Sequence, residues 1–186
     1  MVKTYFWLMK KLKNSELNRI DVSTFKSIKK TPLIIILDNI RSLNNIGSIF
    51  RTSDAFLIEK IYLCGITATP PNRKITKTAI GSTETVEWEY INDINNLVEN
   101  LINQEVKIWS VEQAVKSSKL KDLKSIDADK KHALIFGNEI DGVSQEVVNK
   151  SHGVIEISQY GTKHSLNISV AAGIVIWKFY NLIKSN

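Results

Sequence analysis

The 186-residue sequence predicts an α/β domain with a mainly parallel β-sheet flanked by helices. Apolar runs of strand length alternate along the chain with helix-length segments, as expected of parallel strands joined by crossover helices. Polar, often glycine-containing stretches follow several of the runs, at the position where α/β folds bind ligands. The predicted organisation is a basic helical extension over residues 1–31 and one folded domain over residues 32–186.

The first thirty residues hold the whole net charge of +6, because they contain eight basic and two acidic side chains. Apolar residues recur there at near-helical spacing from about Thr4 to Ile20, which predicts an amphipathic helix. A basic segment ahead of a neutral body suits a polyanion such as RNA. On charge alone, a solvated helix face that binds nothing is an equally good interpretation.

The predicted strands are short apolar or alternating runs. Leu33–Asp38 is continuously apolar, which is typical of a strand buried on both faces. The later strands are read from the same kind of pattern: KIYLCG (60–65), ETVEWEY (84–90), VKIWSVE (106–112), HALIF (132–136) and GVIEIS (153–158).

Helices are predicted between these runs from amphipathic or small-residue patterns. Residues 68–84 contain Pro70, Pro71 and Gly81, and they are predicted to form a turn-rich loop with one short helix. The predicted helices are NIGSIFRTSDAF (45–56), INNLVENLINQ (94–104), SQEVVNK (144–150) and HSLNISVAAGIVIWKFYNLI (164–183).

Several classes of protein and site lack their sequence patterns. The single cysteine, Cys64, excludes an intrachain disulfide and a C-x-x-C motif. The three histidines have no metal-ligand spacing, so no metal site is predicted. Nucleotide-binding glycine fingerprints, phosphate loops and the G-x-S-x-G elbow are absent. No apolar run reaches membrane-spanning length and the start does not resemble a signal peptide, so a cytoplasmic protein without a membrane partner is expected.

The polar stretch after the first strand is LDNIRSLNNIGSIFRTSDAF, which contains Asn45 and Arg51. Asn45 is placed to cap the helix that follows. The guanidinium of Arg51 has the geometry to clamp a phosphate or orient a substrate hydroxyl. Pairing of Arg51 with Asp54 or Asp38 is the simpler interpretation of that motif by itself.

The stretch after HALIF is GNEIDG. Gly137, directly after a buried strand, lets a ligand approach the backbone. Glu139 is placed to bind a cation or to anchor a loop. A strand-to-helix turn explains the same residues. SVEQA, after VKIW, is a further polar stretch at a predicted strand end.

The last such stretch, SQYGTKHSLNISVAAG, passes from a polar loop into an apolar helix. Ser165 or His164 is predicted to cap that helix. This leaves unexplained Asn167, a poor helix former that would then lie one turn inside the helix.

Taken together, these stretches resemble three motifs of the SpoU (TrmH-type) family of RNA ribose 2′-O-methyltransferases in the SPOUT superfamily. NIGSIFRT is similar to the first motif, FGNEIDGVS to the second and IEISQYGTKHSLNISVA to the third. The resemblance covers about residues 33–180. It departs from the family pattern at Ser158, where the family usually has a proline that would preset the loop's φ angle.

The resemblance implies a fold in which the C-terminal segment forms a deep trefoil knot. It also implies that the protein is a homodimer and that its cofactor is S-adenosylmethionine. By motif position, the cofactor contacts fall on Gly137, Ile157 and Leu166. The catalytic positions implied in the same way are Arg51, Asn45, Glu139, Ser165 and Asn167.

The implied reaction is methyl transfer from a sulfonium to a ribose 2′-hydroxyl of RNA. Arg51 would stabilise alkoxide character on that hydroxyl, and Ser165 and Asn167 would hold Arg51 or the ribose. No large N-terminal RNA-binding domain of the kind some relatives carry is visible, which favours tRNA as the substrate. The same reaction on ribosomal RNA and a catalytically silent RNA-binding module are the alternatives.

Overall fold

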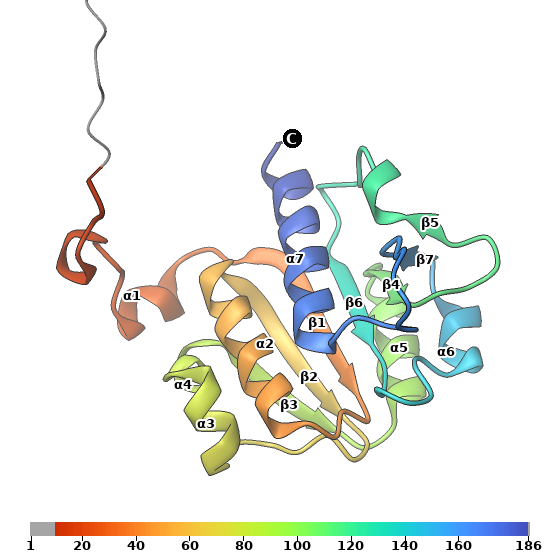
Figure 1. Ribbon diagram of the computed structural model, residues 1–186, viewed down its shortest axis with the longest axis horizontal. Coiled ribbons are helices and arrows are strands. Elements are labelled where there is room, and N and C mark those ends of the chain that lie inside the picture. Colours follow the sequence, from red (N-terminus) through yellow and green to blue (C-terminus); the bar gives the residue numbers. More distant parts are fainter. Residues whose placement is uncertain (1–9, 186) are drawn as a thin grey trace, which may run out of the picture.

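A computed structural model describes residues 10–185 of the chain, and in that part seven strands form one sheet (Figure 1). The sheet order is β3-β2-β1-β6-β4-β7-β5, and every neighbouring pair is parallel. The predicted mainly parallel sheet is therefore confirmed. The strands are β1 (Thr31–Asp38), β2 (Ile58–Cys64), β3 (Glu87–Ile91), β4 (Lys107–Val111), β5 (Ser118–Lys119), β6 (His132–Phe136) and β7 (Gly153–Glu156).

Helices cover both faces of the sheet, so the domain has three layers (Figure 1). Leu33, Ile35 and Leu37 of β1 face α2 and α7, whereas Ile34 and Ile36 face α5 and α6. This alternation explains why β1 is apolar at every step. The α-helices are α1 (Val22–Ser27), α2 (Leu43–Ala55), α3 (Arg73–Ala79), α4 (Ser82–Thr85), α5 (Ile94–Asn103), α6 (Gln145–Lys150) and α7 (Ile168–Lys184).

Two short elements and one helix differ from the sequence-based expectation. Residues 68–84 form two short helices, α3 and α4, rather than one. The two-residue strand β5 and the 3-10 helix Leu120–Asp122 were not predicted, because elements of two or three residues are too short to show a periodic pattern.

The predicted helix over residues 4–20 is wrong in its described part, and residues 4–9 lie outside the described residues. Between residues 10 and 20 the only helical element is the 3-10 turn Asn14–Glu16, and all of these side chains are exposed. Apolar spacing does not stabilise a short helix without a surface to pack against. The helix forms later, at α1, where Asp21 caps the first turn and Phe25 is buried in the main core.

The carboxyl ends of the four central strands lie level with one another. Leu37 of β1 pairs with Phe136 of β6, Phe136 pairs with Val111 of β4, and Val111 pairs with Ile155 of β7. The stretches that follow these strands therefore start from the same edge of the sheet, where chain connections leave in opposite directions. Among residues 10–185, none of the helices combines the length and the apolar character of a membrane span.

Candidate active site

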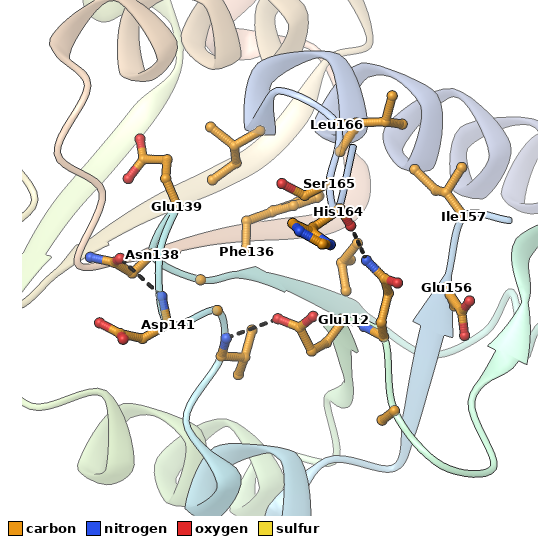
Figure 2. Close-up of a pocket in the computed structure, with 18 of the residues that line it drawn as sticks. Glu112, Phe136, Asn138, Glu139, Asp141, Glu156, Ile157, His164, Ser165 and Leu166 are labelled. Carbon is orange, nitrogen blue, oxygen red and sulfur yellow. Dashed lines mark hydrogen bonds between the residues drawn. The ribbon is translucent and has the colours of Figure 1, made fainter. Parts of the chain in front are cut away.

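A cleft of about 960 Å³ lies at this edge of the sheet, within the size range of small-molecule sites (Figure 2). It is lined by segments after β4, β6 and β7 and by the start of α7. The expected meeting of SVEQA, GNEIDG and SQYGTKHS at one edge is confirmed. The stretch DNIRSLNN lies beside the cleft and contacts it through Glu139.

The segment after β6 is a tight loop that its own hydrogen bonds hold in place. Asn138 Oδ1 accepts the N–H groups of Ile140 at 2.8 Å and Asp141 at 3.3 Å. The Asn138 amide donates to the carbonyl oxygen of Asn39 at 3.0 Å, which ties the loop to the end of β1. A Cβ at Gly137 would lie 2.2 Å from the carbonyl carbon of Gly142, so the loop closes only with glycine there.

Glu112, which the sequence did not single out within SVEQA, holds this loop from the β4 side (Figure 2). Its Oε2 accepts the N–H of Val143 at 3.1 Å, and its Oε1 accepts the N–H of Gln113 at 2.7 Å. Gln113 in turn donates its side-chain amide to the carbonyl oxygen of His164 at 2.7 Å. The sequence signal that could have indicated Glu112 is its position as the first polar residue directly after the strand β4.

Three predicted site residues form a hydrogen-bonded link between the three motifs. Glu139 accepts the N–H groups of Arg41 and Ser42 at 3.3 Å each, and the side-chain amide of Asn45 at 3.4 Å. The Asn167 amide donates to Asn45 Oδ1 at 3.1 Å. Residues that are 94 and 122 positions apart from Asn45 therefore meet at the rim of the cleft.

The caps of α2 and α7 differ from the prediction. Asn167 itself caps α7, because its Oδ1 accepts the N–H of Ser169 at 2.9 Å. Ser165 lies outside the helix, in the loop that lines the cleft. Ser42 rather than Asn45 caps α2, so the amide of Asn45 is free for the link to Glu139 and Asn167. The asparagine that seemed misplaced inside a helix thus marks where the helix begins.

The three positions that the resemblance assigns to the cofactor all line the cleft: Gly137, Ile157 and Leu166. Figure 2 shows Ile157 and Leu166 on the side of the cleft formed by β7 and α7, with Ser165 beside them. Glu139 lies across the cleft, on the loop after β6. The structure therefore places seven of the eight predicted positions in the cleft or in the hydrogen-bonded link at its rim.

Arg51 is the eighth, and it lies on the exposed surface of α2, outside the residues that line the cleft. Its simpler interpretation as an ion-pair partner is wrong. Asp54 accepts a hydrogen bond from Thr85, and Asp38 accepts one from Asn39. Within the described residues, the Arg51 guanidinium has no hydrogen-bond or ion-pair partner, and it therefore makes no hydrogen bond to Ser165 or Asn167.

The charge of the lining suits a cationic ligand. Four carboxylates line the cleft, at Glu112, Glu139, Asp141 and Glu156, against the single lysine Lys163. Glu156 is paired with Lys119 at 2.6 Å, and this hydrogen bond lowers the pKa of Glu156. Three carboxylates therefore remain without an ion-pair partner among the described residues, at Glu112, Glu139 and Asp141. Within the described residues, no cluster of His, Cys, Asp or Glu has the composition of a metal site.

Ser158, the departure from the family pattern, lies where the chain leaves β7 for the cleft. Its hydroxyl oxygen is buried and has no hydrogen-bond partner among the described residues. Buried hydroxyls normally form hydrogen bonds, so the hydroxyl of Ser158 is an unsatisfied hydrogen-bonding group at the edge of the cleft.

Comparison with known proteins decides the family. The model of the SpoU rRNA Methylase family matches residues 32–177. The chain belongs to this family. The tRNA (guanosine(18)-2′-O)-methyltransferase of Aquifex aeolicus is 30% identical over 178 residues, an alignment that covers 96% of this chain and 79% of that enzyme. The family assignment from three short motifs is thereby confirmed.

Solved structures of SpoU-family enzymes share the fold. The crystal structure of the A. aeolicus TrmH/SpoU tRNA modifying enzyme superposes with a TM-score of 0.76 at 26% identity, covering 88% of this chain and 81% of that one. An AdoMet-bound rRNA methyltransferase from Sinorhizobium meliloti gives 0.70 at 26% identity. This second match covers 83% of this chain and 58% of the other, so the chain is similar to only part of that enzyme.

Proposed function

We propose that this chain transfers a methyl group from S-adenosylmethionine to a ribose 2′-hydroxyl of tRNA. The observation that carries the proposal is the link Glu139–Asn45–Asn167, which joins all three motifs at the rim of one cleft. The similarity to the A. aeolicus tRNA 2′-O-methyltransferase supports tRNA, because that alignment covers nearly the whole chain. A cytoplasmic location stays a prediction.

The cofactor is S-adenosylmethionine, and the residues of the cleft fit it. The excess of carboxylates in the lining favours a ligand with a sulfonium and an ammonium group. Gly137 offers bare backbone, and Ile157 and Leu166 offer backbone groups beside apolar side chains. When bound, S-adenosylmethionine supplies an electrophilic methyl group. The chain must then place the ribose hydroxyl in line with that methyl and help to remove the hydroxyl proton.

The polar residues at and near the rim are assigned different roles in this reaction. Glu139 and Asn45 are positioning residues, because their side chains are engaged with each other and with the start of α2. Ser165 lines the cleft, and its hydroxyl is available to hold the ribose. Arg51 is a cation on α2 without an ion-pair partner in the part of the chain that the structure describes. We assign it to the RNA side of the site, where it stabilises alkoxide character on the attacking oxygen.

Replacement of Arg51 tests this assignment. Arg51→Ala should abolish methyl transfer and leave S-adenosylmethionine affinity within about twofold of wild type, because Arg51 does not line the cleft. Calorimetric titration with the cofactor and methyl transfer to tRNA measure the two properties separately. Substantial turnover by the variant would show that Arg51 is not catalytic.

We also propose a homodimer, which the exposed face of α7 supports. Val170, Ile174 and Trp177 follow one another at helical spacing, with 51%, 40% and 55% of their surfaces exposed. This apolar stripe begins at Leu166, at the rim of the cleft. Trp177→Lys should convert a dimer into a monomer in light scattering after size-exclusion chromatography. A wild-type monomer at micromolar concentration would contradict the proposal.

The trefoil knot is a further part of the proposal. Residues 157–167 lead from β7, near one edge of the sheet, to α7, which packs against α2 and β1 nearer its centre. The chain thus crosses the cleft between these elements, as threading requires. A crystal structure in which the path through residues 137–167 can be traced continuously decides whether the chain is knotted.

Ribosomal RNA is the second candidate substrate, and the similarity to the S. meliloti rRNA methyltransferase favours it. Methyl incorporation from labelled cofactor into total tRNA and into ribosomal RNA separates the candidates. Label in tRNA alone supports the first, and label in ribosomal RNA alone supports the second. No label in either, with RNA binding intact, supports a silent RNA-binding module.

A further inference from the structure

Four cationic side chains form an exposed surface beside the cleft, here called the basic shelf. It consists of Arg41, between β1 and α2, and Arg73, Lys74 and Lys77 of α3, all of which are exposed. Arg41 and Lys74 line the same hollow of about 240 Å³, together with the start of α2. In Figure 1, α3 and the start of α2 lie at the same end of the sheet as the start of α7.

Close packing of α3 on α2 fixes the position of the shelf. A Cβ at Gly47 would lie 2.1 Å from Thr78 Oγ1 and 2.3 Å from the carbonyl oxygen of Ile75, so α3 approaches α2 to this distance only because residue 47 is glycine. Thr78 Oγ1 also donates to the carbonyl oxygen of Asn44 at 3.1 Å. Gly47, the glycine of the first motif, therefore allows α3 and its shelf residues to pack closely against α2, the helix that carries Asn45 and Arg51.

The shelf is also joined to the rim of the cleft. The backbone N–H of Arg41 donates to Glu139 at 3.3 Å. Glu139 is also part of the hydrogen-bonded link between the motifs, so the backbone of Arg41 is attached directly to that link. The side chain of Arg41 and the three cationic side chains of α3 have no hydrogen-bond or ion-pair partner among the described residues. An RNA whose ribose reached the cleft would thus have its flanking backbone within reach of these cations.

Acidic side chains are absent from the two chain segments that carry the shelf. Residues 39–53 and 60–83 contain no Asp or Glu. Several lysines elsewhere pair with carboxylates, as at Lys150, whose Nζ lies 2.9 Å from Glu99 and 3.0 Å from Glu146. Residues 31–186 are neutral in sum, so their net charge alone does not reveal the shelf.

We propose that the basic shelf binds the sugar-phosphate backbone of the RNA substrate next to the methylated ribose. This inference rests on the proposed function and adds a binding surface to it. Several unpaired cations spread over a short helix and a loop match an extended polyanion, and arginine is suited to phosphate. The shelf is a second basic region, separate in sequence from the N-terminal segment in which the net charge is concentrated.

A pair of charge-matched double variants tests the proposal in the full-length protein. Lys74→Gln with Lys77→Gln removes two charges from the shelf, and Lys121→Gln with Lys124→Gln removes two exposed charges elsewhere. Fluorescence anisotropy with labelled tRNA at several salt concentrations gives the affinity and its salt slope. Calorimetry with S-adenosylmethionine checks that the cleft is intact.

We expect the shelf variant to bind tRNA about tenfold more weakly at low salt, with a salt slope smaller by about 1.5, because two phosphate contacts are lost. The control variant should stay within about twofold of wild type, and both should bind the cofactor as wild type does. Equal losses in both variants, or no loss in the shelf variant, would overturn the proposal.

The outcome for the shelf is separate from the outcome for the reaction. If wild type transfers no methyl group but the shelf variant alone loses tRNA affinity, the shelf stands and the proposed function fails. If wild type methylates tRNA and the shelf variant binds and methylates it equally well, the function stands and the shelf proposal fails.

Discussion

The two walls of the cleft differ in how far the chain itself fixes them. Residues 137–143, the fixed wall, are held by the Asn138 side chain, by Glu112 and by a backbone bond from Gly142 to Asn138 at 2.9 Å. Residues 158–166, the open wall, are mostly exposed. Their one hydrogen bond among the described residues is the contact of 2.7 Å from Gln113 to the His164 carbonyl.

This difference indicates a division of labour in ligand binding. A wall that is already ordered loses little conformational freedom on binding, so its contacts contribute to affinity nearly in full. A wall with few internal bonds must be ordered by the ligand, at an entropic cost for each residue that becomes fixed. We therefore expect the fixed wall to set cofactor affinity and the open wall to adapt to the bound ligand.

Matched glycine substitutions give the strongest contrast between the walls. Gly137→Ala places a Cβ 2.2 Å from Gly142 and 2.3 Å from Val143, whereas a Cβ at Gly161, in the open wall, meets nothing within 4 Å. Relief of this clash displaces the loop from its cofactor-binding form, at a cost of about 2 kcal/mol, which corresponds to roughly thirtyfold weaker S-adenosylmethionine binding. Gly161→Ala should bind within about twofold of wild type.

Calorimetric titration of both variants with S-adenosylmethionine measures this contrast, and thermal melting shows that each variant is folded. Equal affinity losses for the two alanine variants would show that the fixed wall has no special role. A loss at Gly161 alone would reverse the assignment of the two walls.

Glu112→Gln tests the hydrogen bonds through which Glu112 holds the fixed wall. The glutamine keeps one oxygen acceptor but replaces the other with an amide NH₂, so it can no longer accept from both Gln113 and Val143. Loss of one such bond should weaken cofactor binding by about 1 kcal/mol, or roughly fivefold. The same titration measures it, and affinity equal to that of wild type would show that the loop holds its shape without Glu112.

A pH experiment tests how β6, the strand that leads into the fixed wall, contributes to the stability of the protein. His132, the first residue of β6, is 1% exposed; its Nδ1 accepts from Trp109 Nε1 at 3.0 Å, and its Nε2 lies 2.7 Å from the Asp127 carbonyl oxygen. Burial lowers the pKa of His132 below its ordinary value of 6.5. A second ring proton would meet the Trp109 N–H donor, so the neutral ring is the stable form.

The unfolded chain therefore binds the His132 proton more readily than the folded chain does. The stability that the neutral ring provides is present above about pH 6.5 and is lost as the pH falls below it. Asp38, whose pKa burial raises to about 6, changes stability in the opposite direction. The melting temperature of wild type should therefore fall more between pH 7.5 and 5.5 than that of His132→Gln, and parallel curves would contradict this.

Ser158→Pro should have the smallest effect, and it acts on the open wall. Proline presets the φ angle at the position where the family resemblance predicts a proline, so it removes freedom from the unbound loop. We expect S-adenosylmethionine binding to tighten by about 0.5 kcal/mol, or roughly twofold. Weaker binding in the titration would show that the serine φ angle lies outside the range open to proline.

The sequence contained most of the fold, because local periodicity shows strands and helices directly. The parallel arrangement followed from the alternation of these elements, and the meeting of the polar stretches followed from their places at strand ends. Periodicity failed over residues 10–20, where apolar spacing without a packing surface gave one 3-10 turn instead of a helix.

The hydrogen bonds of the site were beyond what spacing alone predicts. That Asn167 caps α7 while reaching Asn45 depends on how the chain returns to α2, and that return is set by packing between distant segments. Glu112 supports the cleft through a backbone N–H of Val143, which no side-chain pattern records. That Arg51 is exposed and has no ion-pair partner among residues 10–185 likewise depends on the partners taken by Asp38 and Asp54.

The identity of the methylated atom tests the proposed reaction most directly. Purified protein is incubated with methyl-labelled S-adenosylmethionine and unmodified tRNA, and the RNA is digested to nucleosides for mass spectrometry. The proposed function predicts label on a 2′-O-methylated nucleoside, with the adjacent phosphodiester resistant to alkaline cleavage because the neighbouring hydroxyl is blocked. Label on a base, or no transfer while tRNA and cofactor both bind, would contradict it.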